Sequence, residues 1–371
     1  MEIKIDREEL FKSVSRVQSI IERRSNMPIL STILLTARGT ELNLSATDLE
    51  LGFQQVIPCE VIEEGSVTIS GRKLFEILKE SRTADFHLKE KENNRVSISD
   101  NVARFDLACL PSDEYPAFVQ PEGITMVEVA GETLREMINK TIYSVTVEDA
   151  GFKLSGVYTQ KMEHEGKSFL RMVSTDGHRL SMIDKPLPGI ELLDLGNGVM
   201  IPKKGMSEIN KLASEEGPLR IGFARNNCIA KKGTALLMIR LLETKFPDYN
   251  SVIPKEIKYS IEVNRNSILE AMRKMLILSN ERYRAVKITL ENNSMELVSI
   301  NPDLGEAQEI MDVKYAGPHM EAGFNPRYFI DALQSMESEV VHLGFIESSK
   351  PCILTGEADE GFLGLIMPMR L

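Results

Sequence analysis

The sequence has no apolar run long enough to cross a membrane, and its first residues lack the apolar core of a secretory signal peptide. Its four cysteines are far apart, with no Cys-x-x-Cys pair and no histidine pattern nearby, which argues against a zinc site or a disulfide framework. Low-complexity tracts are also missing. We therefore expect a cytoplasmic globular protein with buried thiols, no bound metal or cofactor, and no membrane partner.

The length of 371 residues exceeds what one hydrophobic core usually serves, so two or three domains are expected. Hydrophobic residues make up 42% and charged residues 27% of the chain, which is ordinary for a globular protein. Each domain can therefore build its own core.

One stretch recurs three times. Glu2–Ile21 begins with alternating apolar residues, as a strand does, and continues with apolar residues at helical spacing. Asp6 stands where a helix cap would, with Glu9 as its capping partner. The pattern of a strand entering an amphipathic helix returns at Met126 and at Lys258.

A second strand-to-helix pattern also occurs three times, at Ile69, Ile201 and Phe324, and related strand pairs and closing strands accompany each copy. The period of roughly 120 to 135 residues suits whole domains better than solenoid repeats. We predict three domains of one α+β fold, with linkers near Pro111–Gly123 and Phe246–Glu256. The expected domains span residues 1–124, 125–254 and 255–371.

Charge is distributed unevenly. The formal net charge of −11 argues against a nucleic-acid partner, but the six repeated helices together carry more basic than acidic side chains. If these helices share one side of an assembly, that side attracts a polyanion; otherwise they are ordinary solvated faces. The helices are expected at Asp6–Arg24, Arg72–Glu80, Glu132–Lys140, Lys203–Lys211, Arg265–Lys274 and Arg327–Met336.

The most enzyme-like segment is Ser174–Leu180, which contains a serine, Asp176 and His178. Triad partners normally converge from separate segments, and a short turn cannot easily arrange nucleophile, base and orienting group. A hairpin turn is an alternative, with Gly177 at positive φ and Asp176 accepting backbone hydrogen bonds. A third interpretation is that Gly177–Leu180 line a peptide groove.

Several motifs together resemble the bacterial DNA polymerase III beta subunits, the sliding clamps, and the resemblance covers essentially the whole chain. The motifs are Met27-Pro28-Ile29-Leu30, Thr47-Asp48-Leu49-Glu50, Ser174-Thr175-Asp176-Gly177-His178-Arg179-Leu180, Lys245-Phe246-Pro247-Asp248-Tyr249, Leu278-Ser279-Asn280-Glu281 and Met367-Pro368-Met369-Arg370-Leu371.

The resemblance implies three tandem copies of a DNA-clamp fold, with helices lining the interior of a ring and sheets outside. Two chains would join head to tail around duplex DNA. Such a protein is a processivity factor and not an enzyme. It would tether the replicative polymerase catalytic subunit, and would bind the clamp loader and other replication and repair proteins through short apolar peptides.

The resemblance also assigns DNA contacts. Arg24 and Arg72 match arginines that contact DNA in the family. A glutamine and two tyrosines of the family's middle domain are replaced here by Glu148, Phe152 and Lys153. Glu148 would repel phosphate, whereas Lys153 would restore a contact.

A partner groove and a subunit interface are implied as well. Ser251 stands where the groove commonly has an arginine, so peptide preference is expected to differ. The interface would pair Phe105 and Leu107 with Ile277 and Leu278 of the other chain. The groove would comprise Leu154, Thr175, Gly177, His178, Arg179, Leu180, Pro247 and Val252, with Leu365, Ile366, Met367, Pro368, Met369, Arg370 and Leu371 as its other wall.

Two other classes of function compete with the clamp. A hydrolase would use His178 and Asp176, and would lose turnover in a His178→Ala variant. A monomeric peptide-binding adaptor would show the mass of a single chain in solution.

Overall fold

The recurring sequence pattern forms a strand that leads into a helix with at most one residue between them. β1 (Glu2–Asp6) precedes α1 (Arg7–Val17), β10 (Met126–Val129) precedes α3 (Gly131–Asn139), and β18 (Tyr259–Asn264) precedes α5 (Arg265–Leu278). The computed structural model describes residues 1–21, 26–118, 123–146, 155–224, 226–279 and 285–370.

The first helix starts as predicted but ends early. The Asp6 carboxylate accepts the backbone N–H of Glu9 at 2.9 Å, which satisfies an amide that the helix itself leaves free. The expected stripe is buried from Leu10 to Val17. The helix ends at Val17. Ile21 lies just after the turn that follows the helix, and its side chain is buried.

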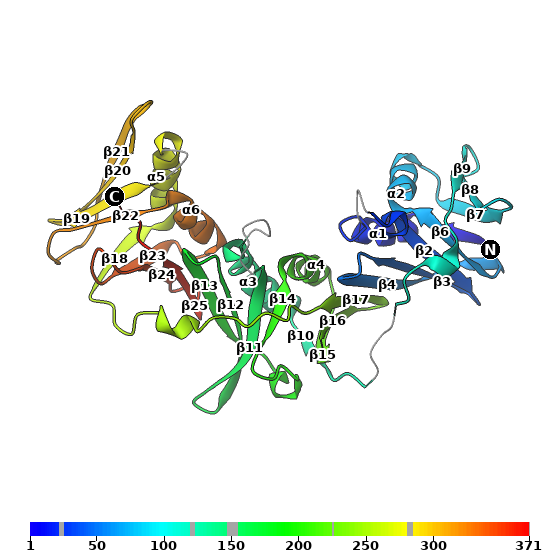
Figure 1. The fold of residues 1–371 in the computed structure, drawn as a ribbon, viewed down its shortest axis with the longest axis horizontal. Coiled ribbons are helices and arrows are strands. Elements are labelled where there is room, and N and C mark those ends of the chain that lie inside the picture. The colour runs from blue at the N-terminus through cyan, green and yellow to red at the C-terminus, as the bar shows by residue number, and fades with distance from the viewer. Residues whose placement is uncertain (22–25, 119–122, 147–154, 225, 280–284, 371) are drawn as a thin grey trace. The chain divides into compact units, whose positions relative to one another are not determined.

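The second pattern gives the other three helices. β6 (Gly65–Ser70), β14 (Val199–Pro202) and β22 (Met320–Phe324) lead into α2 (Gly71–Glu80), α4 (Lys203–Ala213) and α6 (Pro326–Ser335), respectively. The helices pack in pairs, α1 with α2, α3 with α4, and α5 with α6 (Figure 1). Each pair joins the two patterns of one copy.

The described chain divides into two compact units. The first comprises residues 1–129, 192–194 and 215–241, and contains a sheet of order β5-β1-β7-β8-β9 and one of order β10-β15-β16-β17-β4-β3-β2-β6. Its other strands are β2 (Thr32–Arg38), β3 (Glu41–Thr47), β4 (Leu51–Pro58), β5 (Glu60–Glu63), β7 (Asp85–Lys91), β8 (Arg95–Ser99), β9 (Arg104–Ala108), β15 (Leu219–Ala224), β16 (Asn227–Lys232) and β17 (Ala235–Arg240).

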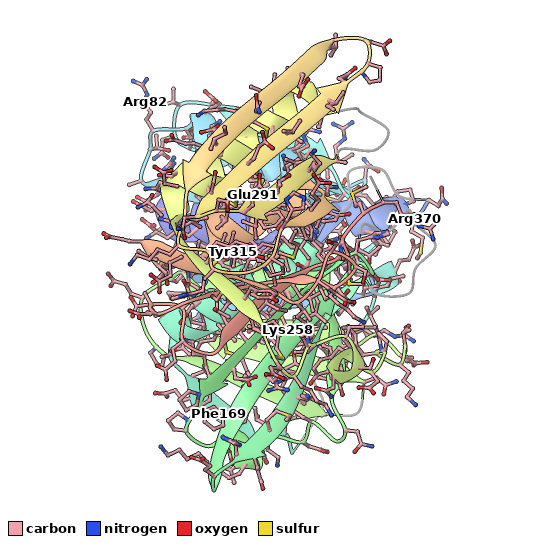
Figure 2. The ribbon with its side chains drawn as sticks, turned by 90° about the vertical axis from the view of Figure 1, so that its left-hand side faces the viewer. Arg82, Phe169, Lys258, Glu291, Tyr315 and Arg370 are labelled. Carbon is pink, nitrogen blue, oxygen red and sulfur yellow. The ribbon has the colours of Figure 1, made fainter. Side chains whose placement is uncertain are left out.

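The second unit contains the other two sheets, of order β14-β11-β12-β13-β25-β24-β23-β18 and β21-β20-β19-β22. Its β20–β21 hairpin is long and carries side chains along both strands (Figure 2). Its other strands are β11 (Gly156–His164), β12 (Lys167–Thr175), β13 (Arg179–Pro186), β19 (Val286–Glu291), β20 (Ser294–Asn301), β21 (Gly305–Asp312), β23 (Val340–Phe345), β24 (Cys352–Gly356) and β25 (Phe362–Ile366).

The strand order repeats three times, which confirms the predicted threefold α+β fold. Each copy has two four-stranded sheets in the same sequential order: β1-β7-β8-β9 with β6-β2-β3-β4, β10-β15-β16-β17 with β14-β11-β12-β13, and β18-β23-β24-β25 with β22-β19-β20-β21. Adjacent copies share a sheet, because β17 pairs with β4 and β25 pairs with β13.

The four cysteines are free thiols, but the prediction that they are buried is correct for two of them. Cys228 and Cys352 are buried, whereas Cys59 and Cys109 are half-buried. Burial raises the pKa of the Cys228 thiol to about 12 and that of Cys109 to about 11. Among the described helices, none is long and apolar enough to span a membrane.

Candidate partner groove and nucleic-acid face

The turn between β12 and β13 is closed by the side chains of Thr175 and Asp176. The Thr175 hydroxyl donates to the carbonyl oxygen of Arg179 at 2.6 Å and accepts the amide of Gly177 at 3.1 Å. The Asp176 carboxylate accepts the amides of His178 and Arg179, each at 3.0 Å. Gly177 has a φ of 86°, a conformation that favours glycine. The predicted hairpin turn is therefore confirmed.

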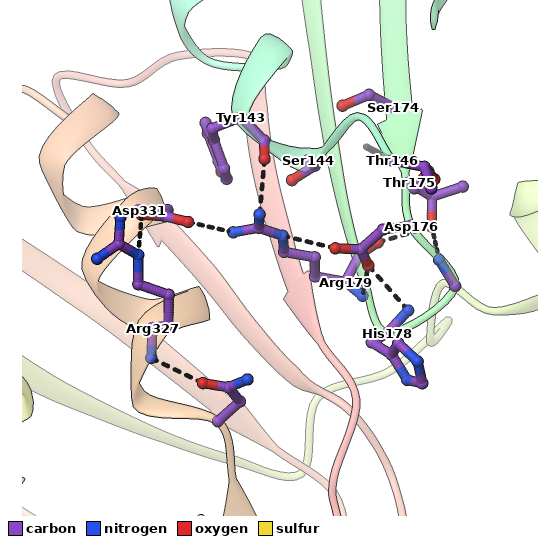
Figure 3. Close-up of polar contacts among 12 residues, drawn as sticks. Tyr143, Ser144, Thr146, Ser174, Thr175, Asp176, His178, Arg179, Arg327 and Asp331 are labelled. Carbon is purple, nitrogen blue, oxygen red and sulfur yellow. Dashed lines mark hydrogen bonds and ion pairs between the residues drawn. The ribbon is translucent and has the colours of Figure 1, made fainter. Parts of the chain in front are cut away.

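Arg179 fixes this turn to neighbouring elements (Figure 3). Its Nε donates to Asp176 at 3.0 Å, and its two terminal nitrogens donate to the Asp331 carboxylate and to the carbonyl oxygen of Tyr143, each at 2.7 Å. The guanidinium also lies 4.7 Å from the ring centroid of Tyr328. With 11% of its side chain exposed, Arg179 is held in place and forms one side of the cavity described below.

Leu365 and Met367, near the C-terminus, lie on the opposite side of the cavity. β25 pairs antiparallel with β13, and beyond its end the amide of Met367 donates to the carbonyl oxygen of His178 at 2.9 Å. The amide of Met369 donates to the carbonyl oxygen of Gly323 at 2.7 Å. The described tail is thus held by backbone hydrogen bonds, whereas the Arg370 side chain is exposed (Figure 2).

A cavity of about 160 Å³ lies between these two sides. Most of its lining atoms belong to apolar side chains, so it suits an apolar group of a ligand. Asp248 and Tyr249 were not predicted as groove residues, although both belong to one of the motifs that carry the family resemblance. The lining residues are Thr175, Gly177, Arg179, Leu180, Pro247, Asp248, Tyr249, Val252, Leu365 and Met367.

One lining residue of the cavity, Tyr249, belongs to a cluster of three aromatic rings. The rings of Tyr158 and Phe246 stack with centroids 4.9 Å apart and planes inclined by 5°. Tyr249 packs against both, and its hydroxyl accepts hydrogen bonds from Arg171 at 3.3 Å and from Gln160. The polar end of this tyrosine is satisfied inside the protein, which leaves its ring to line the cavity.

Several predicted groove residues lie outside the lined cavity. Ile366 is buried and alternates with Leu365, so its side chain points to the opposite face of the sheet. His178 is involved through its backbone carbonyl, which accepts the amide of Met367. Pro368 and Met369 are half-buried. Leu154 and Leu371 fall outside the described residues, as Figure 1 indicates by its grey trace.

The hydrolase interpretation gains no support from the geometry. Ser174 is fully buried, and its hydroxyl donates to the backbone carbonyl of Thr141. The Asp176 carboxylate accepts hydrogen bonds from two backbone amides and from the Arg179 guanidinium. Its contact with His178 is through the backbone amide and not through the imidazole ring, so it does not orient a catalytic base. Within the described residues, no group of three or more His, Cys, Asp or Glu side chains could hold a metal ion.

Of the predicted DNA contacts, Arg72 can be described. It lies in the first turn of α2 with 69% of its side chain exposed, and its Nε is 3.0 Å from Glu76. Lys73 contacts the same carboxylate at 2.7 Å. Hydrogen bonds from Lys73 and Arg72 lower the pKa of Glu76. The other predicted contacts, Arg24, Glu148, Phe152 and Lys153, lie outside the described residues.

Some of the helical cations are used internally. Lys140 is 1% exposed and paired with Glu136 and Asp359, each at 2.7 Å. Arg7 donates to the carbonyl oxygen of Leu78 at 3.0 Å, and Arg265 donates to backbone carbonyls near the end of α6. These contacts satisfy helix-end carbonyls, so the surface of the helices is less basic than their composition suggests.

The predicted interface residues lie on an edge strand, β9, and at the end of a helix, α5. Phe105 and Leu107 belong to β9, and 38% of the Phe105 surface is exposed. Ile277 and Leu278 end α5, and 74% of Ile277 is exposed. An apolar side chain of this size with so much exposed surface is available for contact with another chain.

Three family models of the DNA polymerase III beta subunit match the chain from end to end. The N-terminal domain model matches residues 1–119, the central domain model 128–248, and the C-terminal domain model 250–370. The chain belongs to the DNA polymerase III beta subunit family. Members of this family are beta sliding clamps, which are processivity factors and not catalytic enzymes, and the hydrolase interpretation is therefore unsupported.

Relatives and solved structures agree with this assignment. The beta sliding clamps of Pseudomonas putida and of Escherichia coli K12 are each 31% identical over 373 residues, with all of both chains covered. The Caulobacter crescentus pol III beta structure has a TM-score of 0.94 at 29% identity, covering all of both chains. A Bartonella birtlesii clamp bound to griselimycin has a TM-score of 0.94 at 30% identity, again with full coverage.

Proposed function

We propose that two copies of this sliding clamp close head to tail into a ring around duplex DNA, and that the ring tethers a DNA polymerase. Each chain would contribute three domains, at residues 1–124, 125–254 and 255–371, with the helices on the inside and the sheets outside. The observation that carries this proposal is the repeated strand order, because it leaves two particular sheet edges unused.

Equivalent strands meet at both junctions between copies. β17 of the second copy pairs with β4 of the first, and β25 of the third pairs with β13 of the second. The corresponding strands that remain are β9 of the first copy and β21 of the third. Within the described residues, each of these two strands is bonded on one side alone. Pairing β9 of one chain with β21 of another would repeat the same junction between chains, and doing so twice closes the assembly.

The side chains at these margins support such a contact. Phe105 and Ile277 are exposed apolar residues, and Ile310 on β21 is 63% exposed. We assign Phe105 and Leu107, with Ile277 and Leu278 of the other chain, to the subunit interface. Exposed apolar residues along an unpaired strand favour association with a matching edge.

A clamp of this kind needs no sequence preference. Lys and Arg contacts to phosphate depend on charge and leave the bases unread, so the ring can move along the duplex. Arg72, with Arg24 and Lys153, is proposed to face DNA. Tethering then raises the local concentration of the polymerase at its template without any new chemistry. DNA replication of this type takes place in the cytoplasm of a bacterium.

The groove between β13 and the C-terminal tail is proposed to hold short apolar peptides of partner proteins. Structures of relatives include one with griselimycin and one with polyethylene glycol in a putative tethering region. The cavity has room for an apolar side chain beside the ring of Tyr249. The replicative polymerase subunit, the clamp loader, and other replication and repair proteins are the proposed partners.

Retention on circular DNA tests encirclement. The clamp would be loaded on a nicked circular plasmid by a clamp loader with ATP, and then separated by gel filtration. We expect the clamp to stay with the circle and to dissociate after a restriction enzyme linearises it, because a ring can leave a free end without breaking any contact. Equal retention on circular and linear DNA would contradict encirclement. A plasmid that lacks the restriction site is the matched control.

A further inference from the structure

The first unit contains a turn with the same hydrogen bonds as the groove turn. The Thr47 hydroxyl donates to the carbonyl oxygen of Leu51 at 2.7 Å and accepts the amide of Leu49 at 3.0 Å. The Asp48 carboxylate accepts the amides of Glu50 at 3.0 Å and Leu51 at 2.6 Å. Thr47 to Leu51 therefore correspond one by one to residues 175–179.

The neighbouring strands continue this correspondence. The amide of Arg240 donates to the carbonyl oxygen of Glu50 at 2.8 Å, just as the amide of Met367 donates to His178 at 2.9 Å. Leu51 pairs with Ile239 in register, as Arg179 pairs with Ile366. Arg240 thus occupies the position of Met367, and Met238 that of Leu365.

A second cavity, of about 150 Å³, lies at these equivalent positions in the first unit. Its volume is close to the roughly 160 Å³ of the groove in the second unit. The linker that follows the first copy passes beside it, as the Phe246–Tyr249 segment passes beside the other. The lining residues are Ser45, Ala46, Thr47, Leu49, Glu50, Leu51, Gly52, Tyr115, Pro116, Ala117, Phe118, Asn227, Met238 and Arg240.

The lining residues of the two cavities differ at most of the equivalent positions, and three of these differences bear on which ligand the second cavity would bind. Gly52 replaces Leu180, and the ring of Phe118 takes up that space, since a Cβ on Gly52 would come within 2.5 Å of it. Arg240 replaces Met367 and puts an exposed guanidinium at the mouth. Among the described residues, no hydrogen bond or ion pair engages that guanidinium. A partly apolar lining beside this guanidinium is complementary to an apolar group next to a carboxylate.

Leu49 is the third difference. Its φ is 75°, in the left-handed region where the other turn has Gly177 at 86°. A leucine in this conformation is strained, whereas glycine is not. The Leu49 side chain is nevertheless 54% exposed, so the strain is not offset by burial in a core. A strained, exposed leucine at the rim of a cavity suits contact with a ligand.

We propose that this cavity is a second peptide site, which takes a short extended peptide with a bulky apolar side chain followed by a single carboxylate. The apolar side chain would enter between Leu49, Phe118 and Met238, and the carboxylate would bind Arg240. Glu50, also exposed at the rim, disfavours further acidic groups. The inference extends the proposed tethering function, because one chain would then hold two partners of different preference.

Methyl NMR of the full-length protein can report on both cavities at once. With ¹³C-methyl methionine, Met238 reports on the proposed site and Met367 on the groove, each assigned by a Met→Leu substitution. The probe is the peptide acetyl-Ser-Leu-Phe-Asp-Ser-amide, and the matched control peptide has Asn in place of Asp. We expect a saturable shift of the Met238 methyl that is weakened about tenfold with the Asn peptide.

Two variants identify the contacts. Arg240→Glu should weaken the Asp peptide about tenfold and should reduce the difference between the two peptides. Leu49→Gly fits its backbone conformation without strain and should weaken both peptides about threefold. Binding that these variants leave unchanged, or no Met238 shift at millimolar peptide, would overturn the proposal. A silent Met367 with a shifting Met238 would instead count against the proposed groove alone.

Discussion

At the scale of single residues, Lys140 is a charged side chain that is almost fully buried. It follows α3, and its ammonium group contacts Glu136 and the fully buried Asp359. Burial alone would lower its pKa, but hydrogen bonds from the ammonium to Asp359 and Glu136 raise it. Burial alone would raise the pKa of Asp359, but Lys140, Ser338 and the amide of Glu337 lower it. Both groups are therefore charged at neutral pH.

We expect Lys140→Met to lower the free energy of unfolding by about 3–5 kcal/mol. The substitution leaves the buried Asp359 carboxylate without its cation, whereas Glu136 keeps its contact with Lys185 at 2.9 Å. Urea unfolding followed by circular dichroism would measure the loss. Lys287→Met is the matched control, because its contact with Glu321 is 3.5 Å long and partly exposed, and should cost less than about 1 kcal/mol.

The pH dependence of this difference checks the cause. Since the folded pKa of Asp359 is lowered, its contribution to stability is complete above the pKa of an unfolded aspartate, about 3.9, and is lost as the pH falls through the folded value. In the variant, protonation of Asp359 relieves the unpaired charge. The two proteins should therefore approach each other in stability below about pH 4. A difference that is constant with pH would exclude the ion pair as its source.

Residue roles were predictable where the contacts are local. The Asp6 cap and the Thr175–Arg179 turn follow from the preferences of a few adjacent residues, and the structure has both. The network of Lys140 could not be predicted, because Glu136 is near it in sequence but Asp359 is in another copy of the fold. Lys140 was counted among the cations of the six repeated helices, and its burial removes it from their surface.

At the scale of elements, the C-terminal tail is expected to act as a wall of the groove. Deleting Met367–Leu371 removes the Met367 side chain from the cavity and leaves β25 paired with β13. We expect short apolar peptides of a polymerase to bind at least about tenfold more weakly, because their apolar side chain loses contact on one side. Fluorescence anisotropy with a labelled peptide measures the affinity.

Arg370→Ala is the matched control for this deletion. Arg370 is exposed and does not line the cavity, so its removal should change the affinity less than about twofold. Peptide binding that survives the deletion unchanged would show that the tail is not part of the site.

The elements themselves were largely predictable. Alternating apolar residues followed by helical spacing located the strand-to-helix joins, because both periods are fixed by backbone geometry. The way in which copies share a sheet was not predictable, since the pairing of β17 with β4 joins segments that are distant in the chain. The pairing of β17 with β4 assembles the cavity of the first unit, and the pairing of β25 with β13 assembles the groove of the second.

At the scale of the whole molecule, the unused edges of β9 and β21 predict the effect of interface substitutions. Phe105→Asp and Ile277→Asp should each place a charge in the proposed contact and convert the dimer to single chains. Light scattering after gel filtration would show the mass falling from twice 41.7 kDa to 41.7 kDa.

Ile62→Asp is the control for these substitutions. Ile62 is 49% exposed on β5, at the other margin of the sheet that contains β9. Its substitution should leave the mass unchanged. If it dissociated the protein as readily as Phe105→Asp, the assignment of the contact to the β9 edge would be wrong.

The sharing of sheets between adjacent copies has a consequence for how a ring would respond to dilution. A seam such as β17 with β4 joins parts of one polypeptide, so its halves remain close after they separate and re-form at a rate set by the linker. A seam between β9 and β21 of different chains has no such link. Protein concentration would therefore affect the closing of the seam between chains and not of the seams within a chain. That seam is where the ring would open to admit DNA.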